Sequence, residues 1–345
     1  MAYTTVNKST DYFNTKLYTG NGGTQSVTGV GFQPDFTWLK SRSNSQDSEL
    51  YDAVRTATKA MHSNSASDES TYANGLTAFG TDGFTVGDRN NVNGSGNNMV
   101  AWNWKANGAG SSNSDGTITS TVSANTTAGF SIVTYTGNAT TGATVGHGLG
   151  VAPSYVVGKN RAASGNSWAV YSKGMGNTQL VFWDAQDAAA SYSQIYNNTV
   201  PSNSLITLGN GGNANGNGQN IVLYCFAEKT GFSKFGSYIG NGNNDGTFVY
   251  TGFKPAFVIV KATATTDNWT MYDDKRIGYN PKNYFLYPNL NNAEDTSNPQ
   301  WFDMYSNGFK IRSTSSTTNT SGNKYIYMAF GQSLIGSNNV PCTAR

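Results

Sequence analysis

The chain has 345 residues, of which 12% are charged and 13% are aromatic, and it contains 40 glycines. The charged share is about half of the usual value of roughly 25%, and the abundance of aromatic residues excludes a disordered chain. The glycines do not recur at every third position, which excludes collagen, and helix-favouring residues are too scarce for a helical bundle. The net charge is only +2 and the basic residues are scattered along the sequence, so we expect no nucleic-acid partner. An all-β protein rich in loops remains.

The chain repeats itself, and the first repeated element is the pattern Tyr-x-Gly-Asn. It occurs at residues 18–21, 135–138 and 238–241, at spacings of about 117 and 103 residues. A second element follows each copy: a turn with glycine, then a proline, then an apolar stretch that ends in lysine. It covers residues 31–40, 150–159 and 252–261.

The apolar stretch after each proline predicts a strand. Proline is tolerated at the start of a strand, where its missing N–H matters least. Alternate residues of a strand face opposite sides, and both sides of these stretches are largely apolar. We therefore expect each of these strands to be buried on both faces or to lie where two sheets meet.

Three further elements recur in the same order. They are a short strand around a tyrosine, a short strand after a glycine, and a glycine-rich turn before an apolar strand. The first covers residues 50–52, 170–172 and 271–273; the second covers 83–86 and 308–311, with a weaker match at 205–208; the third covers 96–104, 218–226 and 322–330. Five elements in constant order predict three copies of one unit of about 100 residues, the size of a small β-sandwich.

The predicted fold is therefore all-β, with three tandem antiparallel β-sandwich repeats of jelly-roll, lectin-like or immunoglobulin-like topology. Helices are expected to be short, at residues 53–61 and 184–190. The glycine-rich run 209–218 is expected to be a long hairpin loop. The expected domains are repeat 1 at 1–106, a Gly/Ser/Asn-rich linker at 107–127, repeat 2 at 128–229, repeat 3 at 230–335 and a polar tail at 336–345.

Cysteine content and targeting signals limit the location of the protein. Cys225 lies in an apolar run and is expected to be a buried strand residue, whereas Cys342 lies in the expected polar tail. Two such cysteines do not predict a disulfide scaffold. No apolar run approaches the roughly 18 residues of a membrane span, and the N-terminus lacks the pattern of a signal peptide. We expect synthesis in a cytoplasm and no membrane insertion.

The residues do not form a recognisable catalytic, cofactor or metal site. Neither His62 nor His147 has a partner at metal-ligand spacing, and His147 is expected to be a turn residue. The acidic pairs 68–69, 273–274 and 294–295 lie in polar stretches that are expected to be exposed, and none has a counterpart in the other copies. Asp245 is a weak candidate for Ca²⁺, because no fixed loop spacing supports it. We therefore predict that the protein is not an enzyme and binds no cofactor.

Tryptophans are candidates both for the core and for surface recognition. Trp168 and Trp269 occupy matching positions in two copies, which favours the core for both. Trp301 has no counterpart and lies near a turn, so it is the best candidate for an exposed surface contact. A surface rich in Asn, Ser, Thr and Gly with interleaved aromatic rings suits hydrogen bonding and ring stacking.

The segments 129–137, 146–153, 234–238, 252–257 and 340–345 resemble a family of repeat-built virion structural or tail-fibre-like proteins of marine tailed phages, of the cyanophage and pelagiphage type. The resemblance extends over essentially the whole chain and implies a location on the virion, after synthesis in the host cytoplasm without a signal peptide. It offers no catalytic residues.

Two functions remain open at this point. In the first, the protein is a decoration or accessory protein that binds other virion subunits, and its three copies adopt a pseudo-threefold arrangement that matches a threefold position on a capsid. In the second, it is a tail-fibre or tail-tip adhesin that binds a host-surface glycan or protein receptor. The first repeat begins by about residue 10, which leaves no room for the anchor and shaft expected of a trimeric fibre. A homo-oligomer remains open.

Overall fold

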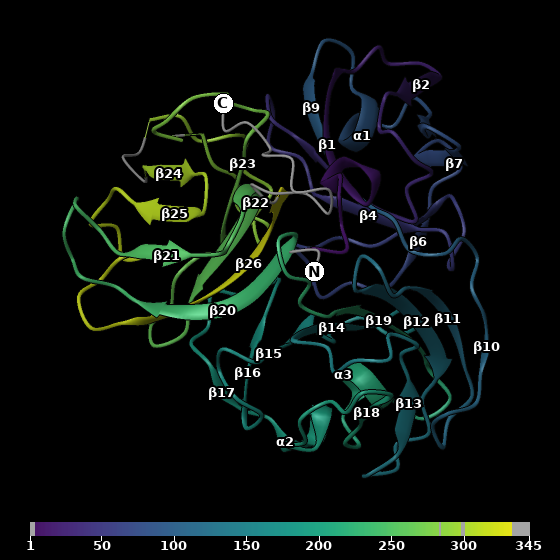
Figure 1. Ribbon diagram of the computed structural model, residues 1–345. Coiled ribbons are helices and arrows are strands. Elements are labelled where there is room, and N and C mark those ends of the chain that lie inside the picture. Colours follow the sequence, from purple (N-terminus) through teal and green to yellow (C-terminus); the bar gives the residue numbers. More distant parts are fainter. Residues whose placement is uncertain (1–3, 283, 298–300, 333–345) are drawn as a thin grey trace.

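The computed structural model describes residues 4–282, 284–297 and 301–332. Within these residues the chain is nearly all β, and the strands of its sheets pair antiparallel (Figure 1). The prediction of an all-β antiparallel fold is thus confirmed. None of the helices in this part of the chain is long and apolar enough to cross a membrane.

The first repeat contains a four-stranded sheet and a smaller three-stranded sheet. The larger sheet has the order β1 (Phe13–Thr19), β9 (Asn98–Trp104), β3 (Phe36–Ser41) and β4 (Glu49–Asp52). The smaller sheet has the order β2 (Gln25–Thr28), β8 (Gly83–Val86) and β7 (Leu76–Gly80). A two-stranded ribbon and two short helices complete it: β5 (Lys59–Ala60), β6 (Ser70–Thr71), the 3₁₀ helix η1 (Ser9–Asp11) and α1 (Asn90–Asn93).

The second repeat has the largest sheet of the molecule, with eight strands. Its centre has the order β12 (Phe130–Thr136), β19 (Asn220–Phe226), β14 (Tyr155–Asn160) and β15 (Ala169–Ser172). This centre is extended by β11 (Ser120–Asn125) and β10 (Ser111–Asn113) beyond β12, and by β16 (Gln179–Phe182) and β17 (Ala190–Ser191) beyond β15. The smaller elements are β13 (Thr144–Gly146) paired with β18 (Leu205–Thr207), and the helices α2 (Ser193–Tyr196) and α3 (Gly212–Asn215).

The third repeat has the same two sheets as the first. The larger one has the order β20 (Ser233–Ile239), β26 (Lys324–Gln332), β22 (Lys254–Ala262) and β23 (Thr270–Asp273). The smaller one has the order β21 (Phe248–Tyr250), β25 (Gly308–Ile311) and β24 (Phe302–Tyr305).

The elements that recur in the sequence occupy equivalent places in the three larger sheets. In each sheet the last strand of the repeat pairs with both its first strand and its proline strand, and the registers match: Phe36 with Trp104, Tyr155 with Phe226, and Phe257 with Phe330. Figure 1 shows the three groups of strands arranged around a common centre.

Each larger sheet has two buried faces, as its apolar pattern predicts. One face packs on the elements of its own repeat, and the three resulting cores are separate clusters. The other face joins a single cluster that contains residues of all three repeats. At its centre the equivalent rings of Trp104, Phe226 and Phe330 contact one another, with centroids 5.7 to 6.4 Å apart. The repeats therefore share one aromatic core.

The same backbone contact recurs at each of the three junctions between repeats. A loop N–H of one repeat donates a hydrogen bond of 2.9 to 3.0 Å to a carbonyl oxygen of another repeat. The acceptor is each time the residue directly after the proline strand. The pairs are Glu69 with Arg161, Ala189 with Thr263, and Glu294 with Arg42. Because the third repeat contacts the first in this way, the three repeats form a closed ring.

Some expectations about local structure are wrong. The segment 107–127 is not a free linker, because it contributes β10 and β11 to the second sheet. Residues 53–61 form no helix, since Thr56 and Thr58 have positive φ angles of 75° and 70°, which a right-handed helix does not allow. Residues 184–190 also form no helix, and Ala189 bonds instead to the third repeat. The run 209–218 contains α3 and joins strands that do not pair with each other.

Candidate functional site

Trp301 lies on the surface, as the sequence predicts, with 46% of its area exposed. It directly precedes β24, and its carbonyl oxygen accepts a hydrogen bond of 2.8 Å from the N–H of Arg312. The pairing of β24 with β25 therefore continues to Trp301. By the alternation of a strand, Trp301 shares a face with Asp303 and Tyr305.

This face belongs to the smaller sheet of the third repeat and carries four exposed aromatic side chains. We call it the outer aromatic face, and its rings are Phe248 and Tyr250 of β21, Trp301, and Tyr305 of β24. Lys310 of the central strand β25 and Arg312, which follows β25, lie between these rings. The rings of Phe248 and Tyr305 lie 6.2 Å apart, and the Lys234 ammonium group lies 5.4 Å from the Tyr250 ring centre. The sequence prediction found Trp301 but missed the other three rings.

The charges on the outer aromatic face are paired with one another. Asp245 accepts Lys310 at 2.5 Å and Arg312 at 3.2 Å. Asp303 accepts the Tyr305 hydroxyl at 3.0 Å and lies 3.5 Å from the Arg312 guanidinium group. The hydrogen bond from Lys310 lowers the pKa of Asp245. Since two cations hold Asp245, its surroundings oppose the Ca²⁺ site considered from the sequence.

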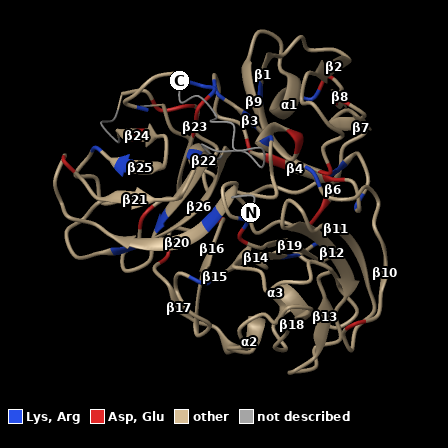
Figure 2. Ribbon diagram, viewed as in Figure 1, with Lys and Arg blue, Asp and Glu red and all other residues tan. Residues whose placement is uncertain are grey.

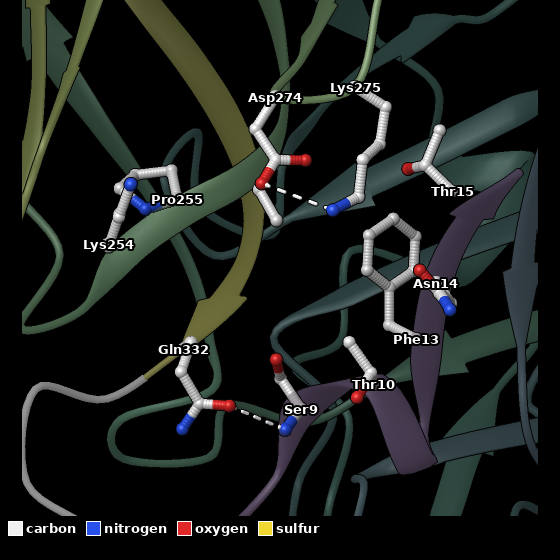
Figure 3. A pocket seen from close by; sticks show the side chains of 11 residues that line it. Ser9, Thr10, Phe13, Asn14, Thr15, Lys254, Pro255, Asp274, Lys275 and Gln332 are labelled. Carbon is white, nitrogen blue, oxygen red and sulfur yellow. Dashed lines mark hydrogen bonds and ion pairs between the residues drawn. The ribbon is translucent and has the colours of Figure 1, made fainter. Parts of the chain in front are cut away.

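A cavity of about 170 Å³ lies where the first and third repeats meet (Figure 3). Thr15 Oγ1 and Asp274 Oδ1 are buried beside it without a hydrogen-bond partner among the described residues. Burial raises the pKa of Asp274. Thr15 occupies the position that Ile132 and Phe235 fill in the other sheets, so a smaller side chain leaves this space open. The cavity is a gap in the packing, lined by both apolar and polar atoms, and it has room for water that could bond to Thr15 and Asp274.

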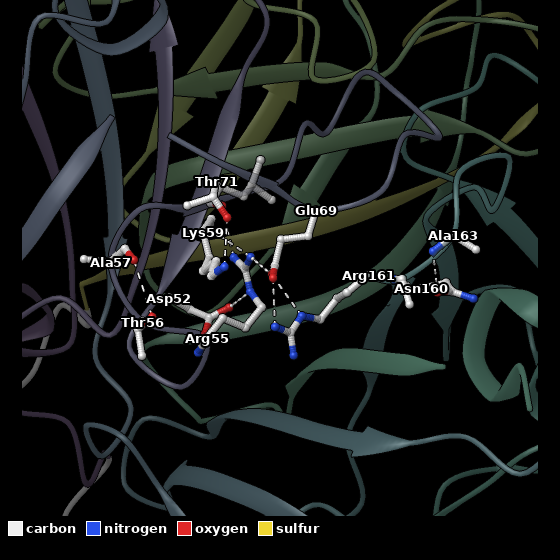
Figure 4. Close-up of polar contacts among 12 residues, drawn as sticks. Asp52, Arg55, Thr56, Ala57, Lys59, Glu69, Thr71, Asn160, Arg161 and Ala163 are labelled. Atoms are coloured by element: carbon white, nitrogen blue, oxygen red, sulfur yellow. Dashed lines mark hydrogen bonds and ion pairs between the residues drawn. The ribbon is translucent and has the colours of Figure 1, made fainter. Parts of the chain in front are cut away.

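The junction between the first and second repeats is held by a network of charges (Figure 4). Arg55 contacts Asp52 at 2.5 Å and Glu69 at 2.9 Å, and Glu69 also accepts Arg161 of the second repeat at 2.9 Å. Burial raises the pKa of Glu69, but the bonds and charges of the two arginines outweigh burial and hold it below its usual value. The network binds two repeats together.

The junction between the third and first repeats has the same arrangement. Arg276 contacts Asp273 at 2.5 Å and Glu294 at 3.0 Å, and Glu294 pairs with Arg42 of the first repeat at 2.7 Å. The expectation that these acidic residues are exposed and lack counterparts is therefore wrong. The pattern Tyr-Asp-x-x-Arg, at residues 51–55 and 272–276, is the sequence signal for the equivalent pairs Asp52–Arg55 and Asp273–Arg276.

The remaining sequence candidates among the described residues lie in the interior. His147 is a buried turn residue: Leu149 N–H donates to its Nδ1 at 3.2 Å, so its Nε2–H faces the Ser202 carbonyl oxygen at 3.2 Å. Burial lowers the pKa of His147. Cys225 is a buried strand residue, and Cys342 lies outside the described residues. Trp168 and Trp269 are core residues, as expected.

No group of three His, Cys, Asp or Glu side chains among the described residues is placed to hold a metal ion. Charged residues are few and dispersed over the ribbon (Figure 2).

Comparison with known proteins identifies the family. Residues 8–333 match a family described as a domain of unknown function, DUF7483, and the chain belongs to this family. No curated protein matches the chain.

Proposed function

We propose that the protein is a non-enzymatic structural protein on the surface of a tailed-phage virion, where it binds other virion subunits as a decoration or accessory protein. The observation that carries this proposal is the closed ring of three equivalent sheets around one aromatic core. A ring with approximate threefold symmetry fits a threefold or quasi-threefold position on a capsid. The resemblance of the repeat segments to virion proteins of marine tailed phages supports the same setting.

The construction of the ring suits a protein that holds its shape on a particle. Its repeats are joined by a shared core and by two buried charge networks, so we expect little movement between them. Its low charge suits contacts whose rims do not need ionic pairing.

The test is to locate the protein on purified particles of a phage that encodes it. We expect mass spectrometry to find it in the particle and cryo-electron microscopy to place copies at lattice positions over the head. Copies restricted to the tail tips would contradict a decoration role, and absence from the particle would contradict any virion role.

A second candidate is an adhesin that binds a host-surface receptor. The outer aromatic face favours it, because this face occurs on one repeat and breaks the approximate symmetry of the ring. We expect excess purified protein to compete with phage for adsorption to host cells if this candidate is correct. Adsorption that the added protein leaves unchanged would contradict it.

A further inference from the structure

We propose that the outer aromatic face of the third repeat binds a neutral oligosaccharide. The proposal names a class of ligand for the adhesin candidate. It rests on that candidate only for its biological setting. The binding itself is a property of the isolated chain.

The other repeats show that the fold does not require aromatic residues at these positions. Phe248 and Tyr250 pair with β25 as Ser26 and Thr28 pair with β8 in the first repeat, in the same register. Ser26 and Thr28 are exposed and polar, and the buried residue between them is Val27, the equivalent of Val249. In the second repeat the same positions hold Thr144 and Gly146 around buried Val145. The inward side chain is thus valine in all three repeats, whereas the outward ones are aromatic in the third repeat alone.

Neighbouring positions follow the same trend. Tyr305 corresponds to Gly80 of the first repeat, and exposed Ile239 corresponds to exposed Thr19 and Thr136. Among the described residues, six of the eight large hydrophobic side chains that are exposed belong to the third repeat. A concentrated apolar patch on the surface marks an interaction site, because soluble proteins rarely expose such patches without a function.

The arrangement of rings and charges selects the ligand. Lys310 and Arg312 lie between the rings of β21 and those around β24. Lys, Asp and Glu are depleted in protein interfaces, so Lys310, Asp245 and Asp303 within this patch argue against a protein partner. A sugar has apolar C–H faces, which stack on aromatic rings, and hydroxyl groups, which bond to carboxylates and guanidinium groups.

The charge balance selects a neutral sugar. Lys310 and Arg312 are paired with two carboxylates, Asp245 and Asp303. A third cation, Lys234 beside the Tyr250 ring, has the Glu228 carboxylate as a nearby opposite charge. An anionic ligand would have to compete with these carboxylates for the cations. A neutral ligand gains hydrogen bonds while the pairs stay intact.

The test uses the purified full chain on an array of immobilised neutral and acidic oligosaccharides. We expect the wild type to bind one or more neutral oligosaccharides, with little dependence on salt concentration. The double variant Phe248→Ser/Tyr250→Thr should lose about tenfold or more in affinity, since it removes two stacking rings. It introduces the residues of the first repeat at equivalent positions, so its thermal midpoint should stay that of the wild type.

The matched control is Val200→Ser, which removes an exposed apolar side chain of the second repeat. This control should bind as the wild type does. The proposal is wrong if the wild type binds no neutral oligosaccharide, if it binds acidic ones only, or if the double variant binds as tightly as the control. It is also wrong if the double substitution abolishes binding to a purified virion protein while sugar binding is absent. None of these outcomes depends on where the protein lies on a particle.

Discussion

Three buried lysines occupy equivalent positions at the ends of the proline strands. Lys40, Lys159 and Lys261 are each fully buried, and each ammonium group donates to a backbone carbonyl oxygen. For Lys40 the acceptor is Leu290 of the third repeat, and for Lys261 it is Gln186 of the second. Burial lowers the pKa of each lysine to about 8. Lys40 and Lys261 thus connect repeats, whereas Lys159 bonds to Asn166 within its own repeat. The charge of all three lysines opposes folding at neutral pH.

The pH dependence of stability tests this view of Lys40. Its pKa is about 8 in the folded protein and 10.5 when unfolded, so the unfolded chain binds more protons between these values. The contribution of Lys40 to the free energy of unfolding therefore rises with pH through this window. Between pH 7 and pH 9 we expect Lys40→Met to lose about 1 kcal/mol of stability relative to the wild type.

Urea denaturation of both proteins at the two pH values measures this change. The comparison with Lys40→Met cancels the titration of other groups, including the buried tyrosines and Cys225. A stability difference that is the same at both pH values would show that Lys40 keeps its ordinary pKa.

The Tyr-x-Gly-Asn element recurs because each copy packs against a buried asparagine from another part of the same repeat. In the second repeat, Asn215 Oδ1 accepts the N–H of Asn138, and its Nδ2 donates to the carbonyl oxygens of Gly209 and Thr140. A Cβ atom on Gly137 would lie 2.5 Å from a backbone oxygen, which requires glycine there. Asn93 and Asn319 make the same contacts in the other repeats.

We predict that Asn215→Ala lowers the free energy of unfolding by about 2–4 kcal/mol, because it leaves buried backbone groups without partners. Exposed Asn210, in the same loop, provides the control. Asn210→Ala should change the free energy of unfolding by less than about 0.5 kcal/mol. Chemical denaturation measures both values. Equal effects of the two substitutions would refute a special role for the buried asparagine.

The charge networks join repeats at two junctions, whereas at the third junction uncharged residues replace the aspartate and the arginine. Asp52 and Arg55 correspond in register and spacing to Ser172 and Met175 of the second repeat. We expect Arg55→Met alone to cost about 3–5 kcal/mol, since it leaves the buried Asp52 carboxylate without its cation. The double variant Asp52→Ser/Arg55→Met should be more stable than the single variant by at least about 1 kcal/mol, because it removes that carboxylate.

Midpoints of urea denaturation for the wild type and both variants measure this difference. Since the Tyr224 hydroxyl donates to Asp52 at 2.7 Å, the double variant should not regain the full stability of the wild type. A double variant less stable than Arg55→Met would contradict this account of the junction.

The sequence predicts the strands well because the repeats mark equivalent positions and the proline strands are apolar on both faces. It does not predict β10 and β11, whose Ser, Thr and Asn residues match the composition of a linker. Their strand structure depends on pairing with β12, which is a tertiary effect. Trp301 was predictable from its lack of a counterpart, but Phe248 and Tyr250 resemble ordinary strand residues until they are compared with Ser26 and Thr28.

At the scale of the whole molecule, the shared core makes the folding of each repeat depend on the other two. One face of each larger sheet is apolar and is covered only by the other two repeats, so a repeat alone would expose that face to water. The ring of Trp104 contacts Phe13 and Phe36 of its own repeat, Phe226 of the second and Phe330 of the third. We therefore expect the three repeats to unfold in a single cooperative transition.

Two substitutions test this cooperativity, one in the core that all repeats share and one in the core of a single repeat. Trp104→Ala opens a cavity in the shared core and should cost about 3–5 kcal/mol, while Phe309→Ala opens one in the separate core of the third repeat. If the repeats are coupled, both variants show one calorimetric transition at a lower midpoint, with coincident changes in ellipticity and tryptophan fluorescence. If they are independent, Phe309→Ala splits the transition, because only the third repeat melts early. The described tryptophans outside the third repeat would then report a later midpoint than the ellipticity does, and the ring would be an assembly of separate domains.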